Sequence, residues 1–524
     1  MKYTILLSFL LIGTWSFSQT WSDDVAEIFY AKCTQCHHQG GVGPFPLITF
    51  AEASSLSGLI YDAVVYENMP PWPPDNSYQE YAHDRSLSDQ QKMTILDWIA
   101  AGAPEGNPAN APAPPVYNPG SLMGAGDLEV QIPTYMSKAT SINDDYVCFA
   151  LPSSLAGDRV IKAIEIVPGN REIVHHALVY IDPTGSSVTD TVGGNCGSPA
   201  SAGASLAMGY TPGSSPLTLP ASSPLKLGIP MPANSQVILN IHYPAGSFGE
   251  YDSTKVIFHF YPQGEPGIRE VLTAPILQNW NFTLPPETHT NVSNQYPNSG
   301  GLPVNYSILS VFPHMHLLGE EIRAYAVNPG GDTANFIHIP HWDFEWQDFY
   351  FFKYIQKAEQ GATMYAEGTF DNTSGNPHNP NNPPITVYPG LNTTDEMFLV
   401  YAHFMLYQNG DESYNLDSLM NLSTAELLEA ENEAWNLQVY PNPFSESVRL
   451  FQSGLNPDDP VSVNIYDANG RLIRELRKPA ALHQDKLDIV WDGNNDQGSR
   501  SEAGIYVISM NVNGRFSHRR IVKH

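Results

Sequence analysis

Residues 125–420 of the 524-residue chain consist of short runs that alternate apolar with polar side chains and end at Gly, Pro, Asn or Ser. A period of two sends successive side chains to opposite faces of a strand, and helical spacing is nearly absent from this stretch. The clearest examples are VIKAIEIVPG, EIVHHALVYI, SQVILNIHYP, TKVIFHFYP and EMFLVYAHFML. Many short strands between turn residues predict antiparallel β-sandwiches, so we expect a mainly β protein.

Five histidines and one methionine of this region have side chains suited to bind copper. Imidazole suits copper, zinc, iron and nickel, and a thioether sulfur shifts the preference toward Cu(I). His314 and His316 stand two apart, so both rings project from one strand face. His175 and His176 are adjacent, so they can share one ion only through a bulge or a local twist. Any one of these residues alone would be interpreted as an ordinary strand histidine or a core methionine. The full set is His175, His176, His242, His314, His316 and Met397.

In this order, and in these local contexts, the six residues resemble the ligands of the copper type II, ascorbate-dependent monooxygenases, which include the peptidylglycine and dopamine β-hydroxylases. The resemblance covers residues 125–420. It implies two jelly-roll-like lobes, at 125–265 and 266–420, with one copper ion in each. The His-His pair with His242 would hold an electron-transfer copper. The His-x-His pair, with Met397 in the acidic segment Asp395-Glu396-Met397, would form the site that binds O2 and abstracts hydrogen.

Three residues near the second ligand set bear on the substrate. Tyr401 is a candidate for the substrate pocket, or else a buried structural tyrosine. Glu320, just after the His-x-His pair, either orients a ligand histidine or is a solvated surface carboxylate. Phe312 stands where peptidylglycine-hydroxylating members of the resembled family carry an arginine. A phenyl ring cannot replace a bidentate carboxylate clamp, so peptidylglycine is disfavoured and the small organic substrate stays unknown.

The sequence Cys33-Thr-Gln-Cys36-His37 is the attachment motif of c-type haem, in which two thioethers anchor the porphyrin and the histidine ligates iron. A C-x-x-C pair could also bind zinc or serve redox exchange. The motif follows a predicted amphipathic helix with Ser22 as its N-cap. With these features, residues 22–104 resemble a small, all-α class I-type cytochrome c.

The sixth ligand of such a haem is predicted from a methionine that precedes a rigid turn. Met69 stands in Asn-Met-Pro-Pro-Trp and is the favoured axial ligand, with His83 and Met93 as the competitors. Downstream, Ser88 and Gln91 form a predicted capping box for a last helix that stops before Pro104.

Composition and cysteine use point to an exported protein. Residues 1–18 have the features of a secretory signal peptide, and no later apolar stretch is long enough for a transmembrane segment. The formal net charge of −29 argues against binding to nucleic acid or to anionic membrane surfaces. In an oxidising compartment Cys148 and Cys196 are expected to form a disulfide, as the resemblance also implies.

Two further boundaries follow from composition. Residues 105–124 are rich in proline and predict a semi-extended linker, whose length is about 3.1 Å per residue. Residues 437–524 hold 11 of the 25 Lys and Arg residues but 10 of the 54 Asp and Glu residues, so the charge pattern changes near residue 436. This segment resembles the β-sandwich sorting domain of type IX secretion substrates, or alternatively another adhesive β-sandwich module. The resemblance implies transit through the periplasm and delivery to the cell surface or medium by the type IX machinery.

Together these features predict an exported copper monooxygenase that holds two copper ions and one covalent haem c and uses O2 to hydroxylate a C–H bond. Electrons would come from an external donor through the fused haem to the His175/His176/His242 copper, or else the haem would serve sensing or anchoring. One alternative is a copper/haem electron-transfer or sensing protein without oxygenase activity. Another is a copper-binding surface protein.

Overall fold

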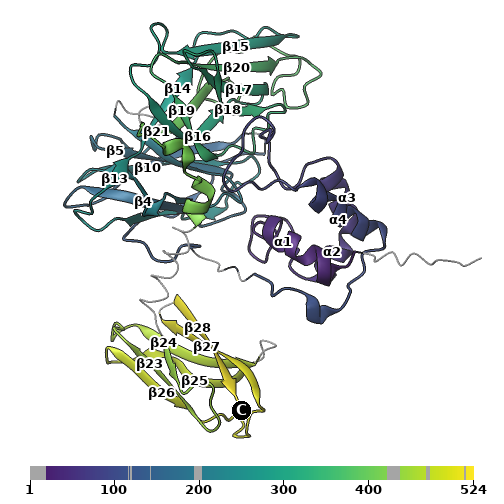
Figure 1. Cartoon of the computed structure of the whole chain (residues 1–524), viewed down its shortest axis with the longest axis vertical. Helices are drawn as coiled ribbons and strands as arrows, with labels where there is room; N and C mark the ends of the chain where they lie inside the picture. Colours follow the sequence, from purple (N-terminus) through teal and green to yellow (C-terminus); the bar gives the residue numbers. More distant parts are fainter. Residues whose placement is uncertain are drawn as a thin grey trace, which may run out of the picture. The chain divides into compact units, whose positions relative to one another are not determined.

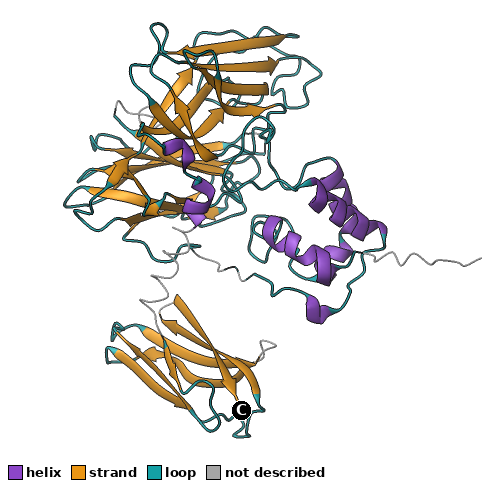
Figure 2. Ribbon diagram, viewed as in Figure 1, coloured by secondary structure: helices purple, strands orange, loops and turns teal. Residues whose placement is uncertain are grey.

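The structure, a computed structural model, describes residues 19–115, 117, 121–141, 143–193, 203–421, 437–467, 472–512 and 515–524. The chain divides into two compact units, Met1–Ser423 and Thr424–His524. Helices α1–α4 all belong to the N-terminal part of the first unit, and sheets make up most of the rest (Figures 1 and 2). The mainly β class is confirmed. The predicted signal peptide and Cys196 lie outside the described residues, and the described part contains no helix long and apolar enough to cross a membrane.

The N-terminal helices pack around a small aromatic core. Trp21, Phe29 and Trp98 contact one another with ring centroids 5.1–6.2 Å apart. The predicted capping box of Ser88 and Gln91 is present. The first helical turn, however, is capped by Thr20 rather than Ser22, because the Thr20 side chain accepts from the Asp23 N–H. The elements are η1 (Trp21–Val25), α1 (Ala26–Lys32), α2 (Phe50–Ser55), α3 (Ser57–Val65), α4 (Asp89–Ala100) and η2 (Pro108–Asn110).

The first β lobe contains a seven-stranded and a four-stranded sheet, with a two-stranded ribbon beside them. Buried Val, Ile and Leu side chains from both sheets form its core, as the alternating patterns predict. The larger sheet contains β1 (Leu128–Gln131), β12 (Lys255–Phe260), β4 (Arg159–Val167), β9 (Leu225–Met231), β13 (Ile268–Glu270), β7 (Leu217–Thr218) and β8 (Ala221–Ser222). The smaller sheet has the order β3 (Asp145–Pro152), β10 (Gln236–Tyr243), β5 (His176–Asp182), β6 (Ser205–Tyr210), and the ribbon pairs β11 (Tyr251–Asp252) with β2 (Tyr135–Met136).

The second β lobe contains two four-stranded sheets around its own core. One sheet has the order β14 (Leu272–Gln278), β21 (Leu399–Leu406), β16 (Tyr306–His314), β19 (Tyr350–Ala358). The other has the order β15 (His289–Tyr296), β20 (Thr363–Asp371), β17 (Gly319–Val327), β18 (Thr333–Ile339), and η3 (Asp411–Ser413) follows β21. Because β13 still pairs with β9 of the first lobe, the first lobe extends past the predicted end at residue 265, to Glu270.

The two lobes share a core. Buried residues of β16, β19 and β21, among them Leu309, Phe351 and Met405, belong to the apolar cluster of the first lobe. Neighbouring residues on the same strands, such as Val400 and Ala402, belong to the core of the second lobe. One sheet of the second lobe therefore has both faces covered, and it holds the lobes against each other.

The segment after α3 is packed against the β lobes rather than within the helical region. The Ala82 N–H donates to the Phe351 carbonyl over 2.8 Å, Tyr81 is buried in the core of the second lobe, and Trp72 contacts Tyr350. The N-terminal part is therefore connected to the lobes by packing as well as by the proline-rich residues 105–124. Proline content predicts an extended chain but does not tell which surface that chain contacts.

The predicted linker is also partly packed. Asn110 donates to Asp23 over 2.7 Å, and the Tyr117 ring stacks on His38 with centroids 4.0 Å apart. The Leu122 N–H donates to the buried Glu165 over 2.6 Å. At least three points of residues 105–124 are therefore held by hydrogen bonds or stacking.

The second unit is a β-sandwich with its own core, which includes Phe444, Trp491 and Ile508. One sheet has the order β22 (Gln438–Tyr440), β23 (Val448–Ser453), β26 (Lys486–Trp491). The other has the order β25 (Leu472–Ala481), β24 (Pro460–Asp467), β27 (Gly504–Val512), β28 (Arg515–Lys523).

Candidate metal centres

Three imidazoles of the first lobe converge on one point. His176 Nδ1 lies 3.4 Å from His175 Nδ1 and 3.2 Å from His242 Nδ1. These residues form the one such group of three described His, Cys, Asp or Glu side chains with ligand atoms within 4.8 Å of one another. Two nitrogens bound to one ion at about 2.0 Å each would lie about 3.3 Å apart at a tetrahedral angle. The donor set therefore fits a copper ion held by three imidazoles.

Strand pairing explains how the adjacent histidines reach one ion. His176 is the first residue of β5 and lies directly opposite His242 of β10. His175 precedes the strand, and its N–H donates to the His242 carbonyl over 3.1 Å. We expected a bulge or a twist within the strand. Instead, the strand begins between the two histidines, which frees the His175 ring to turn toward the other two.

Burial keeps the His175 and His176 rings neutral. It lowers the pKa of His175 to about 4, and it lowers the pKa of His176 well below its usual value. A neutral imidazole has a lone pair to offer a metal at neutral pH. Asp144 Oδ2 lies 3.0 Å from His242 Nε2, and the Tyr146 ring stacks on His242 with centroids 4.3 Å apart. These two neighbours fix the orientation of the His242 ring, with Nδ1 toward the other histidines.

The second ligand set lies at the end of β16 and the start of β21. The His314 and His316 rings are 5.0 Å apart, and Met397 is 8% exposed. His314 Nδ1 is hydrogen-bonded to the Gln347 side chain, and His316 Nδ1 lies 3.0 Å from the Asp395 carbonyl oxygen. Because each Nδ1 has a protein partner, Nε2 is the nitrogen left for a metal. Burial lowers the pKa of His314 to about 3 and that of His316 to about 4, so both rings are neutral.

Glu396 is a fully buried carboxylate that joins the two strands of this site. It accepts from the N–H groups of His316 over 2.9 Å, of Leu318 over 2.6 Å and of Met397 over 3.2 Å. Burial raises the pKa of Glu396 to about 8, and the three N–H donors oppose that rise. This carboxylate therefore sets the spacing between the His-x-His pair and the methionine.

Replacing Glu396 with alanine is expected to destabilise the first unit by about 3 kcal/mol, because three buried N–H groups lose their acceptor. It should also weaken copper binding at the second site about tenfold or more, because the ligands are no longer held together. Thermal unfolding and copper titration measure the two effects. Glu320→Ala is the matched control, since the Glu320 carboxylate is 46% exposed. Equal stability of the two variants would contradict this role.

Members of both ligand sets line one cavity, which has a volume of about 150 Å³. His176 of the first set and His314, His316 and Met397 of the second are among its lining residues. The Phe344 ring stands edge-on to His176 and to His316, at 6.3 and 5.9 Å. Tyr401 also lines this cavity, as the substrate-pocket interpretation requires.

Several side chains that orient the ligand histidines belong to no sequence motif, so their roles could not be predicted from the sequence. Gln347, Asp144, Glu396 and Phe344 contact ligand histidines, but Gln347, Asp144 and Phe344 come from loops far from them in sequence. Glu396 was visible only as part of the acidic segment beside Met397. Glu320 is hydrogen-bonded to His289 over 3.0 Å, so it is a surface carboxylate and orients neither ligand histidine.

The predicted haem-attachment motif, Cys33 to His37, lies at the end of α1. Cys33 and Cys36 are free thiols, and His37 Nδ1 lies 3.0 Å from the Phe45 carbonyl oxygen, which leaves Nε2 for iron. Two thiols and an oriented imidazole fit a covalent haem. Met69 is 40% exposed and follows α3, so its role as an axial ligand stays a prediction. Of the competitors, Met93 is 52% exposed, and His83 lies 3.5 Å from Asp417 of the second lobe.

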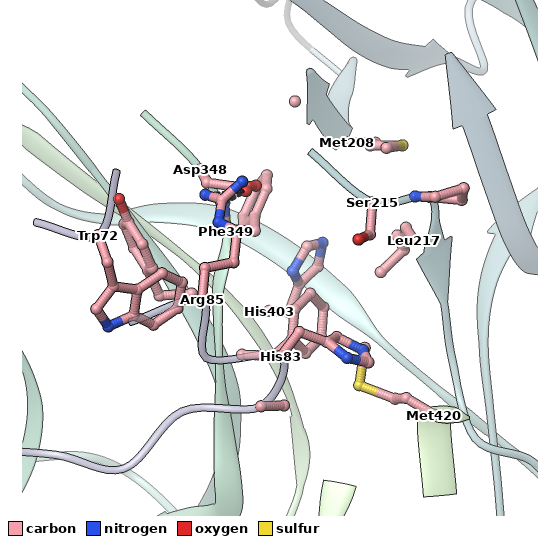
Figure 3. Close-up of a pocket in the computed structure, with 15 residues that line it drawn as sticks. Trp72, His83, Arg85, Met208, Ser215, Leu217, Asp348, Phe349, His403 and Met420 are labelled. Atoms are coloured by element: carbon pink, nitrogen blue, oxygen red, sulfur yellow. Dashed lines mark hydrogen bonds and ion pairs between the residues drawn. The ribbon is translucent and has the colours of Figure 1, made fainter. Parts of the chain in front are cut away.

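The motif also contacts the first lobe. The Gln35 side chain donates to the Gly213 carbonyl and to Ser215, at 3.3 and 3.2 Å. A Cβ atom on Gly213 would lie 2.3 Å from Cys36 Sγ, and the Gly213 φ of +82° favours glycine as well. Figure 3 shows the neighbouring pocket, in which Arg85 of the N-terminal part approaches Asp348 of the second lobe, with a separation of 3.6 Å between Nη2 and Oδ2.

Comparison with known proteins bears on the second ligand set. Residues 277–425 match the family model of the C-terminal domain of copper type II ascorbate-dependent monooxygenases. The match includes His314, His316 and Met397. The matched residues span most of the second lobe, so this lobe is similar to that domain. Residues 451–515, in the second unit, match the model of the FlgD Ig-like domain. No curated protein matches the sequence.

Solved structures give weaker similarities. PorZ, described as an essential bacterial surface component of the type-IX secretion system of Porphyromonas gingivalis, is 22% identical with a TM-score of 0.13. The alignment covers 17% of this chain and 11% of PorZ. Dimeric latent PorU from Porphyromonas gingivalis is 10% identical with a TM-score of 0.15, over 70% of this chain and 34% of PorU. TM-scores this low establish no common fold.

Proposed function

We propose that this chain is an exported copper-dependent monooxygenase that hydroxylates a C–H bond of a small organic substrate. The reaction would consume O2, two electrons and two protons, and would yield the alcohol and water. The observation that carries the proposal is that one cavity is lined by His176 of the first ligand set and by all three residues of the second set, which lie within the segment that matches the copper monooxygenase domain. Bound copper would supply the one-electron chemistry and the reaction with O2.

The residues of the chain have separate tasks in this proposal. His175, His176 and His242 would hold the electron-transfer copper through three imidazoles. His314, His316 and Met397 would hold the second ion, with Gln347 and the Asp395 carbonyl fixing the two rings. The thioether of Met397 is a soft ligand and favours Cu(I). Phe344 and the surrounding apolar side chains would exclude water from the cavity, which limits side reactions.

Electron supply is the second part of the proposal. The haem held by Cys33, Cys36 and His37 would receive electrons from an external donor and pass them to the first copper. The Gly213 loop that contacts Cys36 continues directly from β6, and Tyr210 at the end of β6 pairs with Ala177, the neighbour of His176. A short route of one loop and one strand pair therefore connects the two sites.

The second unit is proposed as the sorting domain that directs the chain through type IX secretion to the cell surface or the medium. Its support is the Val439-Tyr-Pro-Asn-Pro-Phe444 opening and the basic end, on a sandwich with its own core. It would take no part in the chemistry.

The purified chain is expected to contain two copper ions and one haem, and to consume O2 when a reductant and a substrate are present. Elemental analysis and haem absorbance measure the contents, and an oxygen electrode measures uptake. Zinc or iron alone at the non-haem sites would contradict the proposal. Two copper ions without O2 uptake on any substrate would instead favour an electron-transfer or sensing protein.

A further inference from the structure

A second pocket lies at the edge of the second lobe, between β14 and β15, the end strands of its two sheets. The Gln278 N–H of β14 donates to Asn294 Oδ1 of β15 over 3.2 Å, which joins the two strands beside the pocket. The pairing register shifts at Ile276 of β14 and directly after Ile308 of β16, and both residues line the pocket. Such irregularities bend a strand and are frequent next to binding sites.

This pocket is separate from the copper-type ligands. No described residue lines both it and the cavity between the two ligand sets. Phe404 and Tyr401 of β21 are three residues apart, so their side chains project from opposite faces of the strand. Phe404 lines the pocket, whereas Tyr401 lines the cavity. The pocket has a volume of about 340 Å³, within the range of pockets that hold small molecules.

The pocket wall combines apolar with polar side chains. Leu302, Ile308 and Met364 come from the core of the second lobe. The Phe404 and Tyr306 rings pack edge-to-face beside them, with centroids 5.7 Å apart. Four amides and two phenols supply the polar groups, namely those of Gln278, Asn294, Gln295, Asn298, Tyr296 and Tyr306. One ligand can therefore find apolar surface and hydrogen-bonding groups together.

Two aromatic rings are exposed at this pocket. Tyr296 lines it and is 47% exposed, and Trp280 is 45% exposed. Trp280 Nε1 donates to Gln278 Oε1 over 2.8 Å, which holds the indole ring beside the pocket. Tyrosine and tryptophan are frequent at binding surfaces, because each joins a flat apolar face to a polar atom. A sugar ring has the matching form, with a face of C–H groups and a rim of hydroxyls.

The amides are oriented by bonds that leave part of each group for a ligand. Asn294 Oδ1 and Gln278 Oε1 each accept one hydrogen bond, and Gln295 Nε2 donates to the Asn298 carbonyl over 3.3 Å. Within the part of the chain that the structure describes, Gln278 Nε2, Asn294 Nδ2 and Gln295 Oε1 have no protein partner. Two donors and one acceptor are thus available, and a sugar hydroxyl can bind either kind.

The strand edges fit a second class of ligand, an extended peptide, less well. A peptide that adds to a sheet needs a regular free edge. Pro275 lacks an N–H group, and the register of β14 shifts beside it. On β15, the Ser293 carbonyl already accepts from the Asn279 side chain over 2.9 Å. The side chains of the pocket, rather than its main-chain edges, are therefore the available binding groups.

We propose that this pocket binds a neutral glycan. Trp280 and Tyr296 stack on sugar rings, and the amides of Gln278, Asn294 and Gln295 bind hydroxyls. The net charge of −29 disfavours acidic polysaccharides. This site goes beyond the proposed function and requires neither copper nor haem, so it would place the exported chain on a polysaccharide surface whatever reaction it catalyses.

Calorimetric titration of the full, copper-free chain tests the ligand class. The neutral probes are cellotriose, maltotriose, mannotriose and triacetylchitotriose; trigalacturonate is the acidic probe, and a hexapeptide of alternating Gly and Asn is the peptide probe. At least one neutral trisaccharide should bind with a Kd of about 1 mM or lower, and trigalacturonate at least about tenfold more weakly. Binding of no neutral trisaccharide, equal binding of trigalacturonate, or binding of the peptide alone overturns the proposal.

Variants locate the sugar. Trp280→Ala and Tyr296→Ala should each weaken trisaccharide binding about tenfold, while thermal unfolding stays nearly unchanged because both side chains are about half exposed. Tyr354→Ala is the matched control, since Tyr354 is 39% exposed on β19, at the other end of the same sheet as β14. Equal affinity in all three variants overturns the assignment. Loading with copper should leave the affinity unchanged, and a Kd that depends on copper would place the sugar in the other cavity.

Discussion

Turnover should fall by about 100-fold or more when Met397 is replaced by leucine, which corresponds to about 2.7 kcal/mol of transition-state stabilisation. Leucine nearly conserves the volume of the buried side chain, so the fold should persist. The thioether, however, is lost, and with it the soft ligand of the second site. Oxygen uptake measures turnover, and elemental analysis should show about one copper ion retained at the histidine-only site.

A matched control separates ligand loss from repacking. Met405 is 2% exposed, lies on the same strand β21 and packs in the core shared by the lobes. Met405→Leu should keep both copper ions and nearly full turnover. If the two variants behave alike, the thioether of Met397 has no special role, and the ligand assignment is wrong.

Replacing His242 with alanine should remove the fast reoxidation of the reduced haem by the oxidised copper sites. Two of the three convergent imidazoles would remain, and the hole left beside the Tyr146 ring would loosen them. Stopped-flow absorbance of the haem measures the rate. His289→Ala is the control, since that ring is 55% exposed on the second lobe. Equal haem reoxidation in both variants would refute the relay.

Two glycine variants test where electrons enter the first lobe. Gly213 and Gly246 both have positive φ, +82° and +93°, so alanine strains the backbone similarly at each. Only at Gly213 does a Cβ atom meet Cys36 Sγ, whereas nothing lies within 4 Å at Gly246. Gly213→Ala should therefore slow haem reoxidation more than Gly246→Ala does. The reverse order would place the entry point elsewhere.

The sequence predicts well those features that depend on residue type and local spacing. Alternating patterns identify the strands that carry His176, His242 and His314, because one buried face repeats every second residue. The Ser88 capping box depends on two residues three apart, and it is present. The six ligands form an ordered set, and the structure brings His175, His176 and His242 within contact of one another.

Features that depend on tertiary packing could not be predicted. Which side chain orients a ligand ring depends on where a distant loop folds, and Gln347 and Asp144 have no sequence signature for that role. The packing of residues 72–86 against the second lobe could not be predicted either. Trp72 and Tyr81 would fit equally well in a turn of a haem domain. Near the N-terminus, Thr20 and Ser22 are both good N-caps, and only the first turn of the structure distinguishes them.

Product analysis under 18O2 tests whether this chain inserts an oxygen atom from O2 into its substrate. The full chain, loaded with copper and supplied with a reductant, would be given each member of a panel of small organic substrates, and the products would be examined by mass spectrometry. The account predicts a hydroxylated product with one 18O atom, formed only when copper is bound and lost in the Met397→Leu variant. An unlabelled product, or no product from a chain that holds both copper ions, over a wide panel of substrates, would contradict it.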